Sequence, residues 1–545
     1  MLALAALGCG RAEGGRAGPG ATAGAQSSGG GTGKGGTDSK GGAEAGPDGQ
    51  RSYVELEGAP IYTRVQRLTS RQWEHAVTDI LRFTVPHDLS KTFVQPVSGV
   101  TDFDNNEKLL FIARENLPDF ELGAEAAAKL ATSSAEALAA LDAGTDAPTL
   151  VRTLGRRAFR RPLTDAEQTK YEALFGFGEQ LYGAGFANGA ALVIRALLQS
   201  PHFLYRTELG TAGQVLTGYE IASKLSFWLL GTTPSDALLD LASKGDLERL
   251  VGVLDVAGDM LEDPRAVETM RDFHEQLLYV RRYGEIDKIA VPDFDAAVKS
   301  ELVPASDAFF DRVFTQGLGL DELLTSSSAY VGPGLARLYG LDPPQSGLEL
   351  RALGGARAGY FMQVPFLMLG SASEQSNIIQ RAVGVKRISC GSLGLPLHPI
   401  PLPPLQPGQT NRQLVSKVSE ECGSACHAVL LDPLGFALEG FDGLGRERDR
   451  DNGAPIDTTG SYPFSDGVVN FADGTELMNA MAASVQTHTC YARKVTSYAL
   501  GRDIVEADRP LLESLAGVSQ TESLKELALA LVRAPAFRTR EERLP

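Results

Sequence analysis

Hydrophobic residues recur every three to four positions along most of the chain, which is the spacing that places them on one face of an α-helix. In residues 62–83, for example, Leu68, Trp73 and Val77 fall on such a face, and Thr69 is a suitable N-cap before it. The same pattern predicts further helices over residues 117–141, 150–159, 166–181, 188–198, 217–230, 234–241, 247–261, 266–280 and 293–315. We therefore expect an all-α body made of several helical modules.

Strand signals are sparse by comparison. The clearest covers residues 454–462, directly after the turn residues Asp451, Asn452 and Gly453, and it predicts a small β-hairpin near residues 450–465. Six prolines lie between residues 396 and 407, so that segment must be extended. It could be an ordinary surface loop or a spacer that frames a cofactor, and the pattern does not decide between them.

The N-terminus has no such periodicity. Residues 1–9 are a short stretch of small and apolar residues that ends in Cys9, which is typical of a bacterial lipoprotein signal whose cysteine carries the lipid. Residues 10–50 contain 16 glycines among 41 residues, and such a segment cannot bury enough apolar area to fold. We expect a disordered linker over 10–55 that tethers the body to a membrane across roughly 35 Å. A frayed tail with a chance cysteine, and a plain disordered leader, are the alternatives.

Composition narrows the class of protein. The 545 residues include 68 acidic and 51 basic residues, and the net charge of −17 argues against a nucleic-acid-binding protein. No run of 18 apolar residues is present, so no membrane-spanning helix is expected. The common nucleotide-binding, hydrolase and metalloprotease motifs are missing, so we assign no catalytic residue and leave enzymatic activity undecided.

The cysteines carry the main chemical signal. Cys422, Cys426 and His427 form a C-x3-C-H segment, one residue longer than the C-x-x-C-H motif that attaches haem through two thiols and ligates its iron through the histidine. A local disulfide or two free thiols is the alternative. Cys390 and Cys490 could pair in an oxidising compartment. Candidates for a second axial ligand are His398, Met478, Met481 and His488.

Two polar clusters are given structural roles. The arginines in 156–161 are expected to bind carboxylates or helix C-termini within the fold. Asp432, Glu439 and Asp442 follow the cysteine–histidine segment, and we interpret them as capping or turn residues rather than ligands.

Several sequence segments follow one another along the chain in a characteristic order. They are Arg67–Thr69 through Ile80–Leu81 with Phe103–Asn106, Leu154–Thr164 with Leu198–Arg206, Glu220–Leu229 with Leu335–Gly340, Cys426–His427 with Asp432–Asp442, and Cys490–Arg493 with Tyr498–Arg502. Their order resembles a bacterial multi-domain family, common in planctomycetes and myxobacteria, that is named only by domains of unknown function 1587, 1595, 1592, 1588 and 1585. The five modules are expected, in that order, at residues 60–140, 148–210, 213–342, 349–462 and 466–540.

The resemblance implies a protein of the periplasm or cell surface with a cytochrome-c-like fourth module. Cys422 and Cys426 would then hold haem c and His427 would ligate its iron, although the family pattern is C-x-x-C-H. Cys390 and Cys490 match cysteines that recur in the fourth and fifth modules, which implies a disulfide between them.

Our leading hypothesis is a cell-envelope lipoprotein, anchored at the outer membrane, that transfers electrons to an envelope redox partner. The alternative is a haem-less binding or scaffold protein at the surface, whose ligand is a polysaccharide or another envelope protein. The link to polysaccharides comes from genomic association within the family and carries no mechanism.

Overall fold

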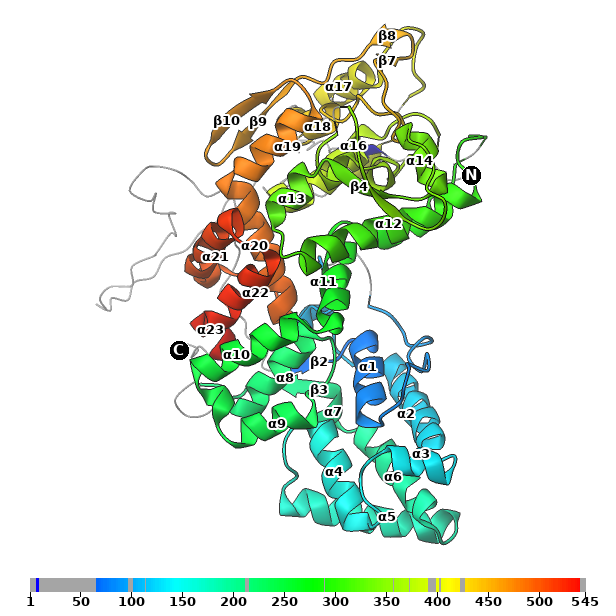
Figure 1. The fold of residues 1–545 in the computed structure, drawn as a ribbon, viewed down its shortest axis with the longest axis vertical. Helices are drawn as coiled ribbons and strands as arrows, with labels where there is room; N and C mark the ends of the chain where they lie inside the picture. The colour runs from blue at the N-terminus through cyan, green and yellow to red at the C-terminus, as the bar shows by residue number, and fades with distance from the viewer. Residues whose placement is uncertain are drawn as a thin grey trace, which may run out of the picture.

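The computed structural model describes residues 65–96, 101–112, 114–210, 215–288, 290–355, 357–371, 373–390, 403–421 and 427–539, together with the backbone of strands β1 (Ala6–Gly8) and β6 (His398–Ile400). The fold is mostly helical with small two-stranded antiparallel sheets, which confirms the expected class (Figure 1). Cys9 and the linker predicted after it lie outside the described residues. Within the described part of the chain, no helix has both the length and the apolar character needed to cross a bilayer.

The N-terminal lobe occupies one end of the elongated body, at the bottom of Figure 1. A short antiparallel pair, β2 (Val65–Arg67) with β3 (Tyr205–Thr207), joins its two ends. Its helices are α1 (Ser70–Ile80), α2 (Leu117–Ala131), α3 (Ala135–Ala140), α4 (Ala147–Phe159), α5 (Asp165–Tyr182), α6 (Phe186–Leu198) and α7 (Pro201–Leu204), with short 3₁₀ turns η1 (Glu107–Leu109) and η2 (Arg114–Asn116).

The middle of the body continues with helices that begin after residue 216. They are α8 (Gly218–Leu229), α9 (Asp236–Ser243), α10 (Leu250–Leu261), α11 (Pro264–Leu277), α12 (Ala296–Thr315), α13 (Leu320–Thr325) and α14 (Pro333–Tyr339), with 3₁₀ turns η3 (Asp246–Glu248) and η4 (Val280–Glu285). Strands β4 (Ser328–Val331) and β5 (Glu349–Ala352) pair antiparallel beside α12 and α14.

The opposite end of the body, at the top of Figure 1, carries short helices and two hairpins. Its helical elements are η5 (Tyr360–Met362), α15 (Val364–Leu367), α16 (Ile378–Ser389), α17 (Asn411–Glu421), the π-helical turn η6 (His427–Leu431) and α18 (Asp432–Phe436). The hairpins are β7 (Arg450–Asp451) with β8 (Ala454–Pro455), and β9 (Gly460–Phe464) with β10 (Gly467–Phe471). A hairpin near 450–465 was expected, and the structure places two in succession.

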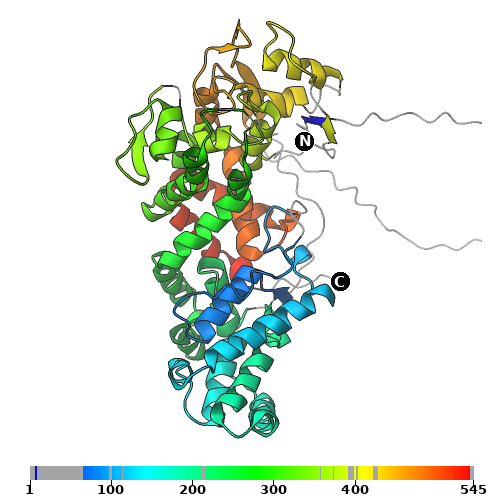
Figure 2. The ribbon, with the colours of Figure 1, turned by 90° about the vertical axis from the view of Figure 1, so that its right-hand side faces the viewer.

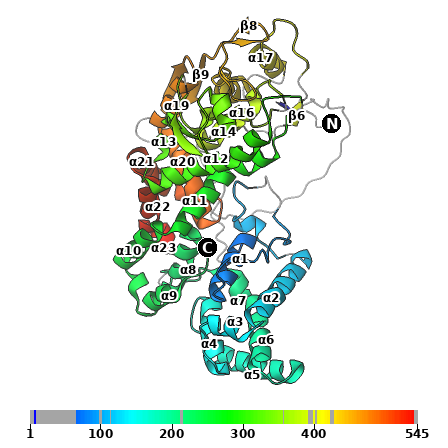
Figure 3. The same cartoon turned by 45° about the vertical axis from the view of Figure 1, so that its right-hand side comes forward.

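The C-terminal helices return along the side of the body to its middle, as the turned views in Figures 2 and 3 also show. They are α19 (Gly474–Ala483), α20 (Val485–Leu500), η7 (Glu506–Asp508), α21 (Arg509–Thr521), α22 (Leu524–Arg533) and α23 (Pro535–Arg538).

Helix starts follow the capping residues in the sequence. Thr69 and Thr217 each accept a hydrogen bond from the backbone of the third helical residue, while Gln72 and Glu220 complete the two capping boxes. The single helix expected over 117–141 is instead two helices, α2 and α3. Ser134 caps the second by accepting from the backbone N–H of Ala137, so the short serine run restarts the helix rather than continuing it.

Buried apolar side chains form two large cores. One lies within residues 68–204 and also includes Phe227 of α8, whereas the other joins residues from 216 to 537 and also includes Phe103. Trp73 and Trp228 are buried, one in each core, as their helical positions predict. The five expected modules therefore do not each have a core of their own, because the last three share one large core.

The arginines of 156–161 bind within the fold, as expected. Arg157 makes a bidentate contact with Asp236, in which Nε donates to Oδ1 at 3.3 Å and Nη2 donates to Oδ2 at 2.9 Å. Arg160 donates to the backbone carbonyls of His202 and Tyr205 at the end of α7, at 2.8 and 2.6 Å. These contacts hold the N-terminal lobe together and join it to the first residue of α9.

Residues 66–106 are joined to residues 498–503 by a set of side-chain hydrogen bonds that we call the terminal clasp. Asn105 Nδ2 donates to the carbonyl of Tyr498 at 2.8 Å, and Gln66 Nε2 donates to the carbonyl of Leu500 at 2.8 Å. Asn106 Nδ2 donates to Asp503 Oδ1 at 2.7 Å. The clasp fixes the loop around residue 105 against the C-terminal end of α20.

Candidate functional site

His427, the predicted haem ligand, begins the π-helical turn between α17 and α18. Its side chain is buried, and its Nδ1 lies 3.8 Å from Oδ1 of Asp432, which is also buried. Its Nε2 has no hydrogen-bond partner among the residues that the structure describes. Cys422 and Cys426 lie outside the described residues, so the role of their thiols in holding haem stays a prediction.

The surroundings of His427 fit an axial haem ligand. A metal-ligating imidazole uses one nitrogen for the metal and turns the other toward a carboxylate or carbonyl that orients the ring. His427 meets both conditions, since Nε2 is unpaired and Nδ1 faces a carboxylate. At 3.8 Å this contact is longer than a hydrogen bond, so it is an electrostatic pairing when the ring is protonated.

Helix α18 is held against α16 by a glycine. A Cβ on Gly435 would lie 2.4 Å from the carbonyl oxygen of Ile378, so the two backbones approach more closely than any side chain allows. On the outer side of α18, the guanidinium of Arg412 stacks over the ring of Phe436 at 4.5 Å. The position of Asp432, at the start of α18, follows from this packing.

The three acidic residues after the predicted haem segment have different roles. Asp442 is a turn residue, as expected, because its Oδ1 accepts from the backbone N–H groups of Leu444 and Arg446 at 2.8 and 2.9 Å. Asp432 faces His427 instead of capping a helix. Glu439 is buried in an ion network, so the interpretation of this residue as a capping or turn residue was wrong.

Glu439 pairs with Arg448 at 3.1 Å and accepts from Ser376 Oγ at 2.5 Å. Arg448 also pairs with the buried carboxylate of Asp451 at 2.9 Å. Burial raises the pKa of Glu439, and the positive charges of Arg448 and Arg381 act in the opposite direction. The network joins the segment after α18 to the first hairpin and to the loop before α16.

The remaining candidate ligands are placed by the fold. Met478 and Met481 are fully buried on α19 in the large core. His488 uses both ring nitrogens, with Nδ1 2.9 Å from Ser519 Oγ and Nε2 2.8 Å from the carbonyl of Ala482, so neither is free for a metal. His398 lies in β6, and its side chain is outside the described residues.

Cys390 and Cys490 form a disulfide with a Cα–Cα distance of 5.5 Å. It joins the C-terminal end of α16 to α20, across a sequence separation of 100 residues. Beside it, Gln486 Nε2 donates to the carbonyl of Ser389 at 2.5 Å. The disulfide thus ties α16, against which the segment of His427 packs, to the C-terminal helices.

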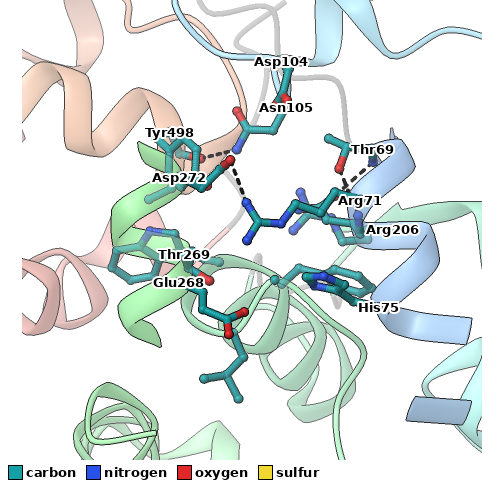
Figure 4. Close-up of a pocket in the computed structure, with 16 residues that line it drawn as sticks. Thr69, Arg71, His75, Asp104, Asn105, Arg206, Glu268, Thr269, Asp272 and Tyr498 are labelled. Atoms are coloured by element: carbon teal, nitrogen blue, oxygen red, sulfur yellow. Dashed lines mark hydrogen bonds and ion pairs between the residues drawn. The ribbon is translucent and has the colours of Figure 1, made fainter. Parts of the chain in front are cut away.

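A second polar site lies in the middle of the body, between α1, α11 and the C-terminal end of α20 (Figure 4). It surrounds a cavity of about 40 Å³. Its lining residues come from segments far apart in the sequence, and they include Thr69, Arg71, His75, Asp104, Asn105, Arg206, Phe227, Trp228, Glu268, Thr269, Asp272 and Tyr498. Sequence reasoning missed this site, because no two of its charged groups form a local motif.

Asp272 is the centre of the ion pairs at this cavity. Its carboxylate pairs with Arg71 Nη1 at 2.7 Å and with Arg281, and it accepts from the hydroxyl of Tyr498 at 2.7 Å (Figure 4). Gln276 Nε2 bridges two carboxylates, donating to Asp272 at 2.8 Å and to Asp104 at 3.1 Å. Two acidic side chains are therefore held close together beside two guanidinium groups.

The surroundings shift the pKa values of two groups that line this cavity. Burial and the neighbouring charge of Asp272 raise the pKa of Asp104 to about 6. Burial, together with the positive charge of Arg71, lowers the pKa of His75, so its imidazole is neutral at pH 7. Near pH 6 the carboxyl of Asp104 exchanges a proton, so it can both donate and accept hydrogen bonds.

The raised pKa of Asp104 predicts a pH-dependent stability that Asp104→Asn removes. The pKa of Asp104 in the folded state is about 6, above the usual 3.8. Its carboxyl group therefore stabilises the fold fully below pH 3.8, and this contribution is lost as pH rises through 6. Because 43% of the Asp104 side chain is exposed, we discount the size for solvent screening to about 1 kcal/mol. Urea unfolding from pH 4.5 to 7.5 should show the variant gaining stability relative to the wild type as pH rises.

Asp102→Asn is the matched control for that experiment. The pKa of Asp102 is lowered, because Lys494 and Arg387 together outweigh the burial that opposes them. Its substitution should therefore lose stability at neutral pH, with the opposite sign. Identical pH profiles for wild type and Asp104→Asn would contradict the assignment.

Comparison with protein families identifies the modules. Five family models match in succession, each described as a protein of unknown function: DUF1587 at residues 66–133, DUF1595 at 146–208, DUF1592 at 216–341, DUF1588 at 357–451 and DUF1585 at 469–537. The chain carries all five domains of this multi-domain family. The DUF1588 model bears the short name PSCyt3. No curated protein and no solved structure matches the chain.

The two sites differ in how the domains build them. His427, Asp432 and Glu439 all lie within the DUF1588 domain. The cavity of Figure 4 is instead lined by the DUF1587, DUF1595, DUF1592 and DUF1585 domains together. The lining includes residues from several sequence segments that carry the family resemblance, among them Arg67–Thr69, Phe103–Asn106 and Tyr498–Arg502.

Proposed function

We propose that the protein is a cell-envelope electron-transfer protein whose DUF1588 domain carries a c-type haem. Cys422 and Cys426 would hold the haem through thioether bonds, and His427 would ligate the iron. The observation that carries the proposal is the buried, unpaired Nε2 of His427, with a carboxylate facing Nδ1. When bound, the haem supplies a one-electron redox couple at its iron.

The residues of the chain have defined tasks in this proposal. Asp432, whose carboxylate faces Nδ1, would orient the imidazole and make it a stronger electron donor to the iron. The burial of His427 and Asp432 keeps water away from Nε2 of the imidazole. Gly435 and the ion network of Glu439 fix the segment on which His427 stands. Cys9 would carry the lipid that places the body at the outer membrane, with the glycine-rich linker as its tether.

The test is expression with and without the haem-maturation machinery of c-type cytochromes. We expect a pyridine haemochrome spectrum of the c type, and a mass increase equal to one haem, only when that machinery is present. Cys422→Ser with Cys426→Ser should abolish attachment, whereas His427→Ala should change the visible spectrum. A folded product without covalent haem under these conditions would refute the proposal.

Asp432→Asn separates a positioning role from a structural one. Loss of the negative charge beside Nδ1 makes the imidazole a weaker electron donor, so the midpoint potential should rise while the haem stays attached. Asp442→Asn is the matched control, because that carboxylate serves a turn and should leave the potential unchanged. Equal potentials for wild type and Asp432→Asn would remove Asp432 from the proposed site.

A second function is supported by a separate observation. The cavity of Figure 4 is built by four domains and includes none of the residues near His427. This arrangement supports ligand binding at the cell surface, by a protein that needs no haem for it. A polysaccharide or another envelope protein would be the partner.

A further inference from the structure

Three polar atoms beside the cavity of Figure 4 are buried and have no hydrogen-bond partner among the described residues. They are Asn105 Oδ1, Arg206 Nε and Trp228 Nε1, in residues that are 9%, 7% and 3% exposed. A buried polar atom left without a partner costs about 1–3 kcal/mol. Three such atoms around one cavity indicate that a hydrogen-bonding group occupies it.

The unpaired atoms are fixed in place by the rest of their side chains. Asn105 Nδ2 is committed to the carbonyl of Tyr498 at 2.8 Å, which leaves Oδ1 as an acceptor. Arg206 Nη2 is committed to Gln66 Oε1 at 2.5 Å, and the guanidinium lies 5.3 Å from the ring centre of Phe227. The buried atoms without a partner are thus one acceptor, from Asn105, and two donors, from Arg206 and the indole of Trp228, and the carboxylate of Glu268 adds further acceptors to the lining. A hydroxyl group both donates and accepts, so it matches this set.

The charges around the cavity disfavour an ionic ligand. The lining carboxylates, Asp104, Asp272 and Glu268, would repel an anion despite the guanidiniums of Arg71 and Arg206. A cation beside Asp272 would compete with the two arginines that already neutralise that carboxylate. A neutral ligand avoids both costs.

We propose that this cavity binds a neutral, hydroxyl-bearing group, such as the end of a polyol or sugar. By the volume that one ordered water needs, about 40 Å³ has room for roughly three water-sized groups. A hydroxymethyl group fits inside, and the remainder of the molecule extends into solvent. The proposal gives the second function above its ligand class and is independent of haem at His427.

The two tryptophans of the chain provide the readout. Trp228 lines the cavity, whereas Trp73 is buried in the N-terminal core and does not line it. The full chain, labelled with 5-fluorotryptophan, should give two ¹⁹F resonances that Trp73→Phe and Trp228→Phe assign. Glycerol, sorbitol and glucose are titrated as neutral probes, with inorganic phosphate and ethylammonium as charged probes.

We expect at least one neutral probe to shift the Trp228 resonance saturably while the Trp73 resonance stays in place. Asn105→Ala should weaken that binding about tenfold, because it removes the one buried acceptor that has no partner among the described lining residues. Asn106→Ala is the matched control, since its side chain bonds Asp503 and does not line the cavity. Its affinity should equal that of the wild type.

Three results would overturn the proposal. The first is a Trp228 resonance that responds to no neutral probe, which would leave ordered water as the only occupant. The second is a saturable shift with phosphate or ethylammonium alone. The third is an equal loss of affinity in the two asparagine variants. The wild-type titration decides the first two even when Asn105→Ala fails to fold, and none of them bears on the haem spectrum.

Discussion

Arg381→Met is expected to lower the free energy of unfolding by about 4 kcal/mol. The guanidinium of Arg381 is completely buried and donates to the backbone carbonyls of Leu367, Leu438 and Phe441 at 2.8 to 3.0 Å, and also to that of Asp442. Methionine fills much of the same volume without any donor, so these carbonyls lose their partner at about 1–3 kcal/mol each. Urea unfolding at pH 7, followed by circular dichroism, measures the loss.

Arg446→Met in the same domain is the control for that experiment. Arg446 has three carboxylate partners, Asp293, Glu374 and Asp442, but its side chain is 31% exposed. Exposed ion pairs contribute little, so the variant should lose at most about 1 kcal/mol. Equal losses for the two arginines would show that the buried carbonyl contacts of Arg381 do not stabilise the fold.

Removing the disulfide should produce a loss of similar size. The bond between Cys390 and Cys490 closes a loop with a sequence separation of 100 residues. In the chain-entropy model, such a loop stabilises the folded state by about 4.7 kcal/mol, because it restricts the unfolded chain. Cys390→Ala with Cys490→Ala should therefore unfold at a clearly lower urea concentration than the oxidised wild type.

Reduction and a second cysteine pair provide the controls. Wild-type protein treated with dithiothreitol should approach the stability of the Cys390→Ala, Cys490→Ala variant. In protein made without haem maturation, Cys422→Ala with Cys426→Ala should cost much less, since a bond between these neighbours would close only a very short loop. No difference between oxidised and reduced wild type would contradict the predicted contribution.

Most helices were predictable because their signals are local. The capping threonines at 69 and 217, with Gln72 and Glu220 three residues later, identify two helix starts that the structure reproduces. Apolar periodicity likewise places the buried faces of α1 and α8, including Trp73 and Trp228. These features depend on residues within one or two turns of each other, so one sequence contains all the necessary information.

The site in Figure 4 was not predictable, because its parts meet only through tertiary packing. Asp104, Asp272 and Tyr498 lie in segments far apart in the sequence, and each alone is an ordinary polar residue. The role of Asp432 was missed for a similar reason. Its carboxylate can face His427 only because a π-helical turn separates them, and that backbone geometry leaves no sequence pattern we could recognise.

The terminal clasp has a consequence for the synthesis of the protein. The side chain of Asn105 donates to the carbonyl of Tyr498, which is synthesised 393 residues later. At translation rates of about 5–20 residues per second, that delay is roughly 20 to 80 seconds, far longer than a helix needs to form. The loop around residue 105 must therefore stay without its final partner while most of the body is made. The DUF1587 domain therefore cannot complete the cavity by itself, because Tyr498 and Ala499 of the C-terminal domain form part of its lining.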